Sequence, residues 1–425
     1  MSAFDKVIGY ETIKNELQQI CDMIHNKERY EALGAKLPQG VLLYGDPGLG
    51  KTLMARSFIE ESGLKAYTVR RNKGNDDFIG NITDTFEKAK DNAPCIVFLD
   101  DMDKFANEDS SHCDAEEYVA VQSGIDEVKN CNVLVLATAN EMWKLPDSLV
   151  RSGRFDRKIE FECPTDKDAK DIIAYYLSDK KVSDDVNMED LAKMMSYISC
   201  AELETILNEA AINSAYERKT SIEMTDLVKS VLRMEYESPD NHIKVSAEDL
   251  RKIALHEAGH LVVSEVLCEG SVGLASVRSS GRSSTGGFIH RCKYYTRRPY
   301  HILVSLAGKA AVELYYSETC ASGCSEDIKR AFNLIREGMS ENATCGFGMV
   351  NISTHEFKTS ENMNARNEAV THAELERYMF KARDILLKNR EFLEKATEAL
   401  VAKETLLSSD IQAIRNSTTI TEVPI

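Results

Sequence analysis

Short runs of hydrophobic residues mark the first part of the chain. Residues 41–44, 95–99 and 133–137 are continuous apolar runs, each followed by glycine or a polar residue. Runs of this length are typical of strands buried inside a sheet. They predict the strands of an α/β domain, with functional side chains expected directly after each strand, at its carboxyl end.

Apolar residues at helical spacing mark much of the remaining chain. Strand signals stop between about residues 166 and 236, where hydrophobic side chains recur with the period of a helix. A further helix is predicted after Ser246, which stands three residues before Asp249 as in a capping box, and Gly270 is its expected end. Amphipathic patterns over residues 364–403 predict more long helices.

The helix after Ser246 carries the sequence His256-Glu257-Ala258-Gly259-His260. Positions i and i+4 of a helix lie one turn apart on the same face, so two imidazoles there can bind one zinc ion. Glu257 can then act as a general base toward a water on that metal. The pentapeptide alone is short, and a buried helix with two incidental histidines explains it equally well.

Composition limits what the chain can be. Its 425 residues are enough for two or three domains. A net charge of -17 argues against a general nucleic-acid binder. No apolar run approaches the roughly 18 residues of a membrane span. The eleven scattered cysteines are typical of reduced thiols in the cytoplasm, and the Cys320/Cys324 pair lacks the second pair of a structural zinc site.

A phosphate-binding loop follows the first predicted strand. The residues Gly45-Asp46-Pro47-Gly48-Leu49-Gly50-Lys51-Thr52 read G-x-x-x-x-G-K-T, and Leu53 continues into a predicted helix. This is the strand–loop–helix context that the motif requires. Backbone N–H groups of the loop can wrap the phosphates of ATP, Lys51 neutralises the β- and γ-phosphates, and Thr52 ligates Mg²⁺. Residues 46–53 are therefore predicted to bind the nucleotide.

Polar residues after the next two predicted strands complete a candidate hydrolysis site. Asp100 and Asp101 end the second strand; the first is predicted to hold Mg²⁺ and the second to orient the attacking water. Asn140 follows the third strand and can position the same water. Arg151 and Arg154 come next, either as surface charges or, in an oligomeric ATPase, as groups that reach the γ-phosphate of the next subunit.

These motifs resemble, in order and spacing, those of AAA+ ATPases. The resemblance implies a homohexamer that hydrolyses ATP between subunits, with Arg151 and Arg154 donated in trans. In that family the motif at the end of the second predicted strand usually reads Asp-Glu, so Asp101 departs from it. The loop that follows usually contains glycines. Residues 107–114 contain none, and we assign them no role.

One segment resembles the FtsH-like branch of that family. Phe78-Ile79-Gly80 matches its aromatic–hydrophobic–glycine pore loop, which implies a grip on the substrate chain. A buried aromatic residue in a strand-to-helix connection is the alternative.

FtsH-like zinc proteases join such an ATPase to a peptidase, and the resemblance extends from Phe4 to about Ile414. Catalytic zinc typically has three protein ligands. The residues alone leave the third ligand open among His290, His301, Glu313, Glu326 and Asp327. Residues 322–327 resemble the family's Thr-Gly-Ala-Ser-Asn-Asp segment, whose last residue is the third ligand. The resemblance therefore implies Asp327, with Glu326 where the family has asparagine and Cys324 where it has alanine.

A candidate substrate strand lies between the zinc helix and this segment. Val277 and residues 279–290 suggest short strands around a turn. In FtsH-like proteases the segment that matches Gly286-Gly287-Phe288 forms an edge strand beside the metal, where an extended substrate can add by β-augmentation. A strand edge without a ligand is the alternative.

The combined interpretation is a multidomain chain. Residues 1–164 are predicted to be the large α/β subdomain of an AAA+ P-loop ATPase, residues 165–236 its helical lid, and residues 237–425 a mostly α-helical zinc metallopeptidase domain. We expect zinc, ATP and Mg²⁺ as cofactors and unfolded or damaged proteins as substrates. The family's N-terminal transmembrane hairpin has no counterpart in this sequence, which predicts a soluble, cytoplasmic member or a truncated chain.

Two functions fit this interpretation. The first is an ATP-dependent zinc endopeptidase that unfolds proteins, translocates them through a hexameric pore and hydrolyses their peptide bonds. The alternative is a non-proteolytic unfoldase or remodelling chaperone with a scaffold as its C-terminal domain. Glu257 favours the first function, because a scaffold has no need of a base between two histidines.

Overall fold

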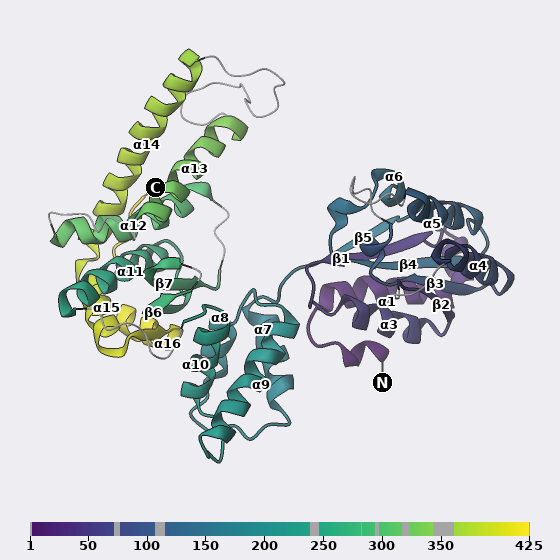
Figure 1. The fold of residues 1–425 in the computed structure, drawn as a ribbon, viewed down its shortest axis with the longest axis horizontal. Helices are drawn as coiled ribbons and strands as arrows, with labels where there is room; N and C mark the ends of the chain where they lie inside the picture. Colours follow the sequence, from purple (N-terminus) through teal and green to yellow (C-terminus); the bar gives the residue numbers. More distant parts are fainter. Residues whose placement is uncertain are drawn as a thin grey trace. The chain divides into compact units, whose positions relative to one another are not determined.

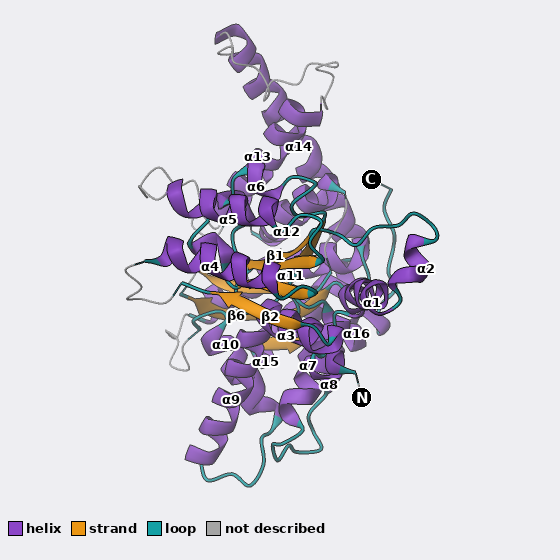
Figure 2. Ribbon diagram, turned by 90° about the vertical axis from the view of Figure 1, so that its right-hand side faces the viewer, coloured by secondary structure: helices purple, strands orange, loops and turns teal. Residues whose placement is uncertain are grey.

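The computed structural model describes most of the chain and divides it into two compact units. The described residues are 2–71, 77–106, 115–238, 246–281, 283–293, 297–316, 324–342 and 361–424. The first unit comprises Met1–Ser178 and Tyr197–Thr205, and the second comprises Asp179–Ser196 and Ile206–Ile425. Helices make up most of the chain (Figure 2).

A five-stranded parallel sheet of order β2-β3-β4-β1-β5 forms the centre of the first unit (Figure 1). The inner strands β1 (Gly40–Gly45), β3 (Cys95–Leu99) and β4 (Val133–Ala139) contain the three predicted apolar runs. The edge strands β2 (Lys65–Val69) and β5 (Arg157–Phe161) were not predicted. Both carry exposed polar residues, because one side of an edge strand faces water, so no continuous apolar run marks them.

Helices cover both faces of this sheet. Leu17 and Phe58 from α1 and α3 are fully buried in the cluster on one face, and Ile82 and Ile125 from α4 and α5 in the cluster on the other. This covering makes an α/β layered domain. The helices are α1 (Glu11–His25), α2 (Lys27–Glu31), α3 (Lys51–Ser62), α4 (Phe78–Asp91), α5 (Ala115–Glu127) and α6 (Asp147–Val150), with 3-10 helices η1 (Ala3–Lys6), η2 (Met102–Lys104) and η3 (Met142–Lys144).

In the segment predicted to be a helical lid, residues 165–236, all the elements of secondary structure are helices. It contains α7 (Asp166–Leu177), α8 (Met188–Met194), α9 (Cys200–Tyr216) and α10 (Met224–Met234). The two compact units divide it: α7 and the start of α9 belong to the first unit, and α8, α10 and the rest of α9 to the second.

Helix α11 (Ala247–Leu267) runs through the core of the second unit. The Ser246 hydroxyl caps it by accepting a hydrogen bond from the Asp249 backbone N–H at 3.1 Å, as the capping-box spacing predicts. Every residue from Ala254 to Glu265 is buried, so this part of the helix has no face exposed to solvent. Its histidines and glutamate are therefore interior residues.

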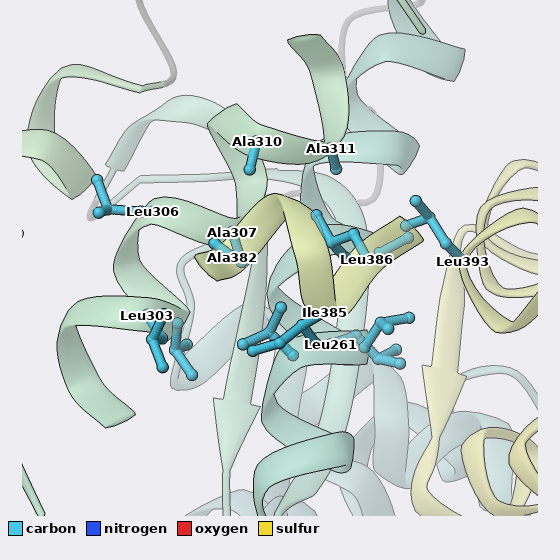
Figure 3. Packing of buried hydrophobic residues seen from close by; sticks show 14 of the residues in the cluster. Leu261, Leu303, Leu306, Ala307, Ala310, Ala311, Ala382, Ile385, Leu386 and Leu393 are labelled. Atoms are coloured by element: carbon cyan, nitrogen blue, oxygen red, sulfur yellow. The ribbon is translucent and has the colours of Figure 1, made fainter. Parts of the chain in front are cut away.

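Helices and a small sheet surround α11. The antiparallel sheet has the order β7-β6-β8, which leaves β7 at an edge. Alanines on α12 pack in the core with leucines from α11, α12, α14 and α15 (Figure 3). The elements are β6 (Val272–Ser280), β7 (Ser283–Arg291), β8 (Thr405–Leu407), α12 (Arg298–Tyr315), α13 (Ser325–Asn342), α14 (Glu361–Lys388), α15 (Arg390–Lys403) and α16 (Ser408–Asn416).

The predicted fold class is confirmed: a parallel α/β unit is followed by a mostly helical one. Among the described helices, none is both long enough and apolar enough to cross a membrane.

Candidate nucleotide site and metal centre

The predicted phosphate loop connects β1 to α3. Gly48 and Gly50 have φ angles of 82° and 87°, a backbone conformation that residues with a Cβ rarely adopt. A Cβ on Gly48 would lie 3.1 Å from both the Ala201 Cβ and the Ser199 Oγ. Lys51 is 6% exposed, and its Nζ donates hydrogen bonds of 2.7 Å to the carbonyl oxygens of Gly45 and Asp46. The loop and its lysine are thus held together by their own backbone.

Two hydroxyls converge on the carboxylate predicted to hold Mg²⁺. Thr52 Oγ1 and Thr138 Oγ1 each donate to Asp100 Oδ1 at 3.0 Å, and Asp100 is 2% exposed. Hydroxyl and carboxylate oxygens are ligands that Mg²⁺ prefers in proteins. Thr138 had no assigned role in the sequence analysis; its position at the end of β4, next to β3, brings it to Asp100.

Asp101 and Asn140 come just after Asp100 and Thr138 in the chain, beyond the ends of β3 and β4. Asp101 has a left-handed backbone (φ 55°), its N–H donates to Thr138 Oγ1 at 2.9 Å, and its carboxylate accepts from Lys104 at 2.6 Å. The backbone N–H of Asn140 donates to Asp103 Oδ1 at 3.0 Å. Sequence reasoning missed Asp103, which is 6% exposed and joins the ends of β3 and β4.

Carboxylates near Lys51 partly offset the effect of its burial. Burial lowers the pKa of Lys51, and the negative charges of Asp103, Asp101 and Asp46 oppose that shift. These charges favour the ammonium form of Lys51, which is the form that binds phosphate.

The two candidate arginines occupy different environments. Arg151 is exposed. Arg154 is 3% exposed, and its Nε and Nη2 donate to the carboxylate of Asp126 on α5 at 3.1 and 2.6 Å; Nη1 donates to the Ser148 carbonyl oxygen. Arg154 is therefore paired within its own chain, whereas the side chain of Arg151 is exposed.

The predicted pore-loop segment begins α4. Asp77 caps the helix by accepting from the Gly80 N–H at 2.8 Å. The Phe78 ring is 6% exposed and packs edge-on against Phe105 with 5.3 Å between ring centroids, while Ile79 is 36% exposed. Of this segment's two apolar side chains, Ile79 is the more accessible. The loop at residues 107–114 lies outside the described residues.

Three ligand atoms meet in the second unit. Asp327 Oδ2 lies 3.2 Å from His256 Nε2 and from His260 Nε2, and the two Nε2 atoms are 3.0 Å apart. Ligand atoms about 2.0–2.2 Å from one tetrahedral zinc ion stand roughly 3.3 Å apart. Two imidazoles and one carboxylate are also the donor types of a catalytic zinc site. The residues therefore fit zinc, and among the described residues they form the one group of this kind.

The other candidates for the third ligand lie elsewhere. His290 hydrogen-bonds to Ser196 Oγ at 3.1 Å, and Glu313 pairs with Lys309 at 2.7 Å. The side chain of Glu326 is 72% exposed and lies 3.9 Å from Lys329. His301 lies on α12 and is not in the group. Of the pair Cys320 and Cys324, Cys320 lies outside the described residues.

Helix α12 packs directly against the ligand nitrogens. His260 Nδ1 hydrogen-bonds to the Val304 carbonyl oxygen at 2.7 Å, which turns Nε2 toward the metal position. A Cβ on Gly308 would lie 2.5 Å from His260 Nε2 and 2.6 Å from His256 Nε2. A Cβ on Gly259 would lie 2.5 Å from the Ala307 carbonyl oxygen. Sequence reasoning missed Gly308, because nothing in its local sequence shows what it faces.

The charge of Asp327 suits a metal ligand. Burial disfavours its carboxylate, but the neighbouring His260 and His256 outweigh that effect and hold the pKa of Asp327 well below its usual range. Asp327 sits in the first turn of α13, where the helix dipole also favours a negative charge.

Glu257 faces the edge strand β7. A Cβ on Gly287 would lie 2.5 Å from Glu257 Oε1, so glycine lets the strand pass over the carboxylate. Burial raises the pKa of Glu257 to about 8, and a cation at the adjacent donor atoms would favour the carboxylate form. Phe288 stacks on Tyr236 with 4.1 Å between ring centroids. The structure thus brings Gly287 beside Glu257, the neighbour of a metal ligand in the chain, on a strand at the edge of its sheet.

The fold and the two sites define an ATPase joined to a metallopeptidase. Residues 41–163 match the family "ATPase family associated with various cellular activities (AAA)", and residues 243–414 match "Peptidase family M41". The chain is 31% identical over 97% of its length to ATP-dependent zinc metalloprotease FtsH 1 of Thermomicrobium roseum, covering 68% of that protein. It is also 30% identical to the ATP-dependent zinc metalloprotease FtsH of Thermus thermophilus, of which it covers 70%. It is 30% identical to FtsH of Leptotrichia buccalis as well, of which it covers 56%.

The chain belongs to the FtsH family of ATP-dependent zinc metalloproteases. Zinc and ATP with Mg²⁺ are the cofactors of this enzyme class, and the two imidazoles and the carboxylate supply a matching metal site.

Proposed function

We propose that this chain unfolds protein substrates with the energy of ATP hydrolysis and cleaves them at the metal centre of its second unit. One observation carries the proposal: a three-ligand metal group, a buried glutamate and an edge strand lie together in a chain that also has a phosphate loop. A scaffold domain would not require that combination.

At the nucleotide site, residues 46–53 bind the phosphates of ATP. Lys51 neutralises them, and Thr52 and Asp100 hold Mg²⁺. Asp101 and Asn140 orient the attacking water. The aspartate side chain is one methylene shorter than the glutamate usual in the family, so the hydrolysis step is expected to be slower than with glutamate.

At the metal centre, His256, His260 and Asp327 hold zinc, which when bound polarises the scissile carbonyl and acidifies a water molecule. Glu257 accepts the proton of the attacking water and passes it to the leaving amine. Because Gly287 has no side chain, β7 passes close to Glu257, and a substrate strand paired with β7 lies within reach of that carboxylate.

The substrate lies along β7 as an added strand. Its backbone pairs with the free edge at Gly286-Gly287-Phe288, which sets the cleaved bond beside the ligands. The segment Phe78-Ile79-Gly80 grips the substrate chain during translocation, with the half-exposed Ile79 as the side chain that makes contact.

The active assembly is a homohexamer of this chain, in which Arg151 reaches the nucleotide of the next subunit. Its exposure supports this role, and the internal pairing of Arg154 with Asp126 supports a positioning role for the second arginine. The domain limits at residues 164 and 236, and a cytoplasmic location, stay predictions from the sequence.

Degradation of a loosely folded protein tests the proposal. The purified chain is expected to degrade it with ATP and Mg²⁺, but not with ADP, and a zinc chelator should stop cleavage while ATP turnover continues. Glu257→Gln serves as the matched control. Chelator-insensitive remodelling of the substrate without cleavage would instead identify a non-proteolytic unfoldase.

A further inference from the structure

The two ligating histidines differ in the hydrogen-bond partner of Nδ1, the ring nitrogen that points away from the metal position. For His260, Nδ1 lies 2.7 Å from a backbone carbonyl oxygen. For His256, Nδ1 lies 3.9 Å from the sulfur of Cys324, within the reach of a hydrogen bond to sulfur. A zinc ion bound at both Nε2 atoms, which face Asp327, would leave the proton of each neutral ring on Nδ1. In that tautomer His256 Nδ1–H would donate to the Cys324 sulfur.

Cys324 also begins the helix that carries the third ligand. Its carbonyl oxygen accepts a hydrogen bond of 3.0 Å from the Ile328 N–H, which closes the first turn of α13. Asp327 lies within that turn, and Cys324 is 3% exposed. Through its side chain Cys324 touches one ligand directly, and through its backbone it fixes the turn that presents another.

We propose that Cys324 is a positioning residue of the metal centre, whose sulfur orients the His256 ring with Nε2 toward Asp327. The proposal rests on the proposed role of these residues in zinc binding. Partners of this kind change metal affinity by roughly 10–100-fold, and sulfur is a weak acceptor, so about tenfold is expected.

Zinc titration of the full chain tests this role. Cys324→Ala removes the sulfur and keeps the backbone hydrogen bond, and the Kd for Zn²⁺, measured by competition with a chromophoric chelator, is expected to rise about tenfold. Cys324→Ser keeps an acceptor and should recover part of the loss.

Cys292→Ala is the matched control. This thiol is 1% exposed, lies in the same unit and donates to the Gly270 carbonyl oxygen at 3.3 Å. This hydrogen bond goes to a backbone carbonyl and Cys292 is not part of the metal group, so its loss should leave the zinc Kd unchanged.

The visible absorption spectrum of the Co²⁺-loaded chain separates positioning from packing, because it reports the geometry of the ligands. It should change in Cys324→Ala and return toward the unsubstituted spectrum in Cys324→Ser. A residue that acts by packing alone would lower the unfolding temperature and leave this spectrum unchanged.

An unchanged zinc Kd and Co²⁺ spectrum in Cys324→Ala, with a folded chain by circular dichroism, would overturn the proposal and leave the zinc site intact. If Cys324→Ala fails to fold, Cys324→Ser decides: a Kd raised severalfold together with an altered Co²⁺ spectrum supports the role, and a Kd and spectrum equal to those of the unsubstituted chain contradict it. A chain that binds no zinc at all would overturn the proposed function itself.

Discussion

The nucleotide site and the metal centre satisfy their polar groups in different ways. At the nucleotide site, Thr52 and Thr138 donate to Asp100, and Lys51 donates to two loop carbonyls. Donors and acceptors are matched within the protein. At the metal centre, Nε2 of His256, Nε2 of His260 and Oδ2 of Asp327 face one another within 3.2 Å. Such an arrangement requires a proton or a cation among them.

The geometry of the nucleotide site is therefore expected to depend less on its cofactor than the geometry of the metal centre does. Lys51 holds the phosphate loop through hydrogen bonds to the loop's own backbone, so the loop's geometry is expected to change little when a nucleotide binds. The metal centre joins α11 to α13 through buried ionisable groups, so zinc binding is expected to contribute to the stability of the second unit.

The largest expected effect isolates the chemistry of the metal centre. Glu257→Gln keeps the size of the side chain and removes its basicity, so peptide-bond cleavage should fall by about 10³-fold. Zinc content and ATP turnover should be unchanged, because no metal ligand or nucleotide contact is altered. Cleavage of a fluorogenic peptide, with metal analysis of the same sample, measures both. Robust cleavage by this variant would contradict the assigned base.

Lys51→Ala makes the reciprocal change at the nucleotide site. Loss of the phosphate-binding ammonium should lower ATP turnover at least about 100-fold and stop degradation of folded proteins. Zinc binding should persist, since the two sites are built from different residues. A steady-state ATPase assay and zinc titration on one preparation test whether the two sites are independent; loss of zinc together with ATP turnover would show that they are not.

Substitutions of the neighbouring acids Asp327 and Glu326 test which of them is the third metal ligand. Structural zinc sites bind the ion with about 10–16 kcal/mol shared among few ligands, so loss of one of three ligands in Asp327→Ala should weaken zinc binding at least about 100-fold. Glu326→Ala should have little effect, because that side chain is 72% exposed and points to no ligand. Zinc Kd values for both variants decide, and the reverse order would transfer the ligand role to Glu326.

The smallest effects concern the segment that opens α4. Phe78→Ala removes a buried ring packed on Phe105 and should lower the free energy of unfolding by about 3 kcal/mol. Ile79→Ala should leave stability nearly unchanged and slow the degradation of folded proteins severalfold, while short peptides are cleaved normally. Denaturation curves and degradation assays check each variant. Undiminished degradation by Ile79→Ala would remove that side chain from the grip.

The spacing of residues along the chain determined the parts of each site that lie within one local element. The phosphate loop is one turn between a strand and a helix, and the two histidines share a face of α11, so both follow from sequence. The resemblance to FtsH-like proteases supplied Asp327, 71 residues from His256, which no local pattern indicates.

The tertiary structure alone decided which side chains meet across elements. It buried Phe78 against Phe105, paired Arg154 with Asp126, and placed Cys324 and Gly308 against the ligating rings. Backbone hydrogen bonds and short-range periodicity set local structure from a few neighbouring residues. Contacts between distant segments depend on how whole helices pack, and that packing is distributed over the entire core of each unit.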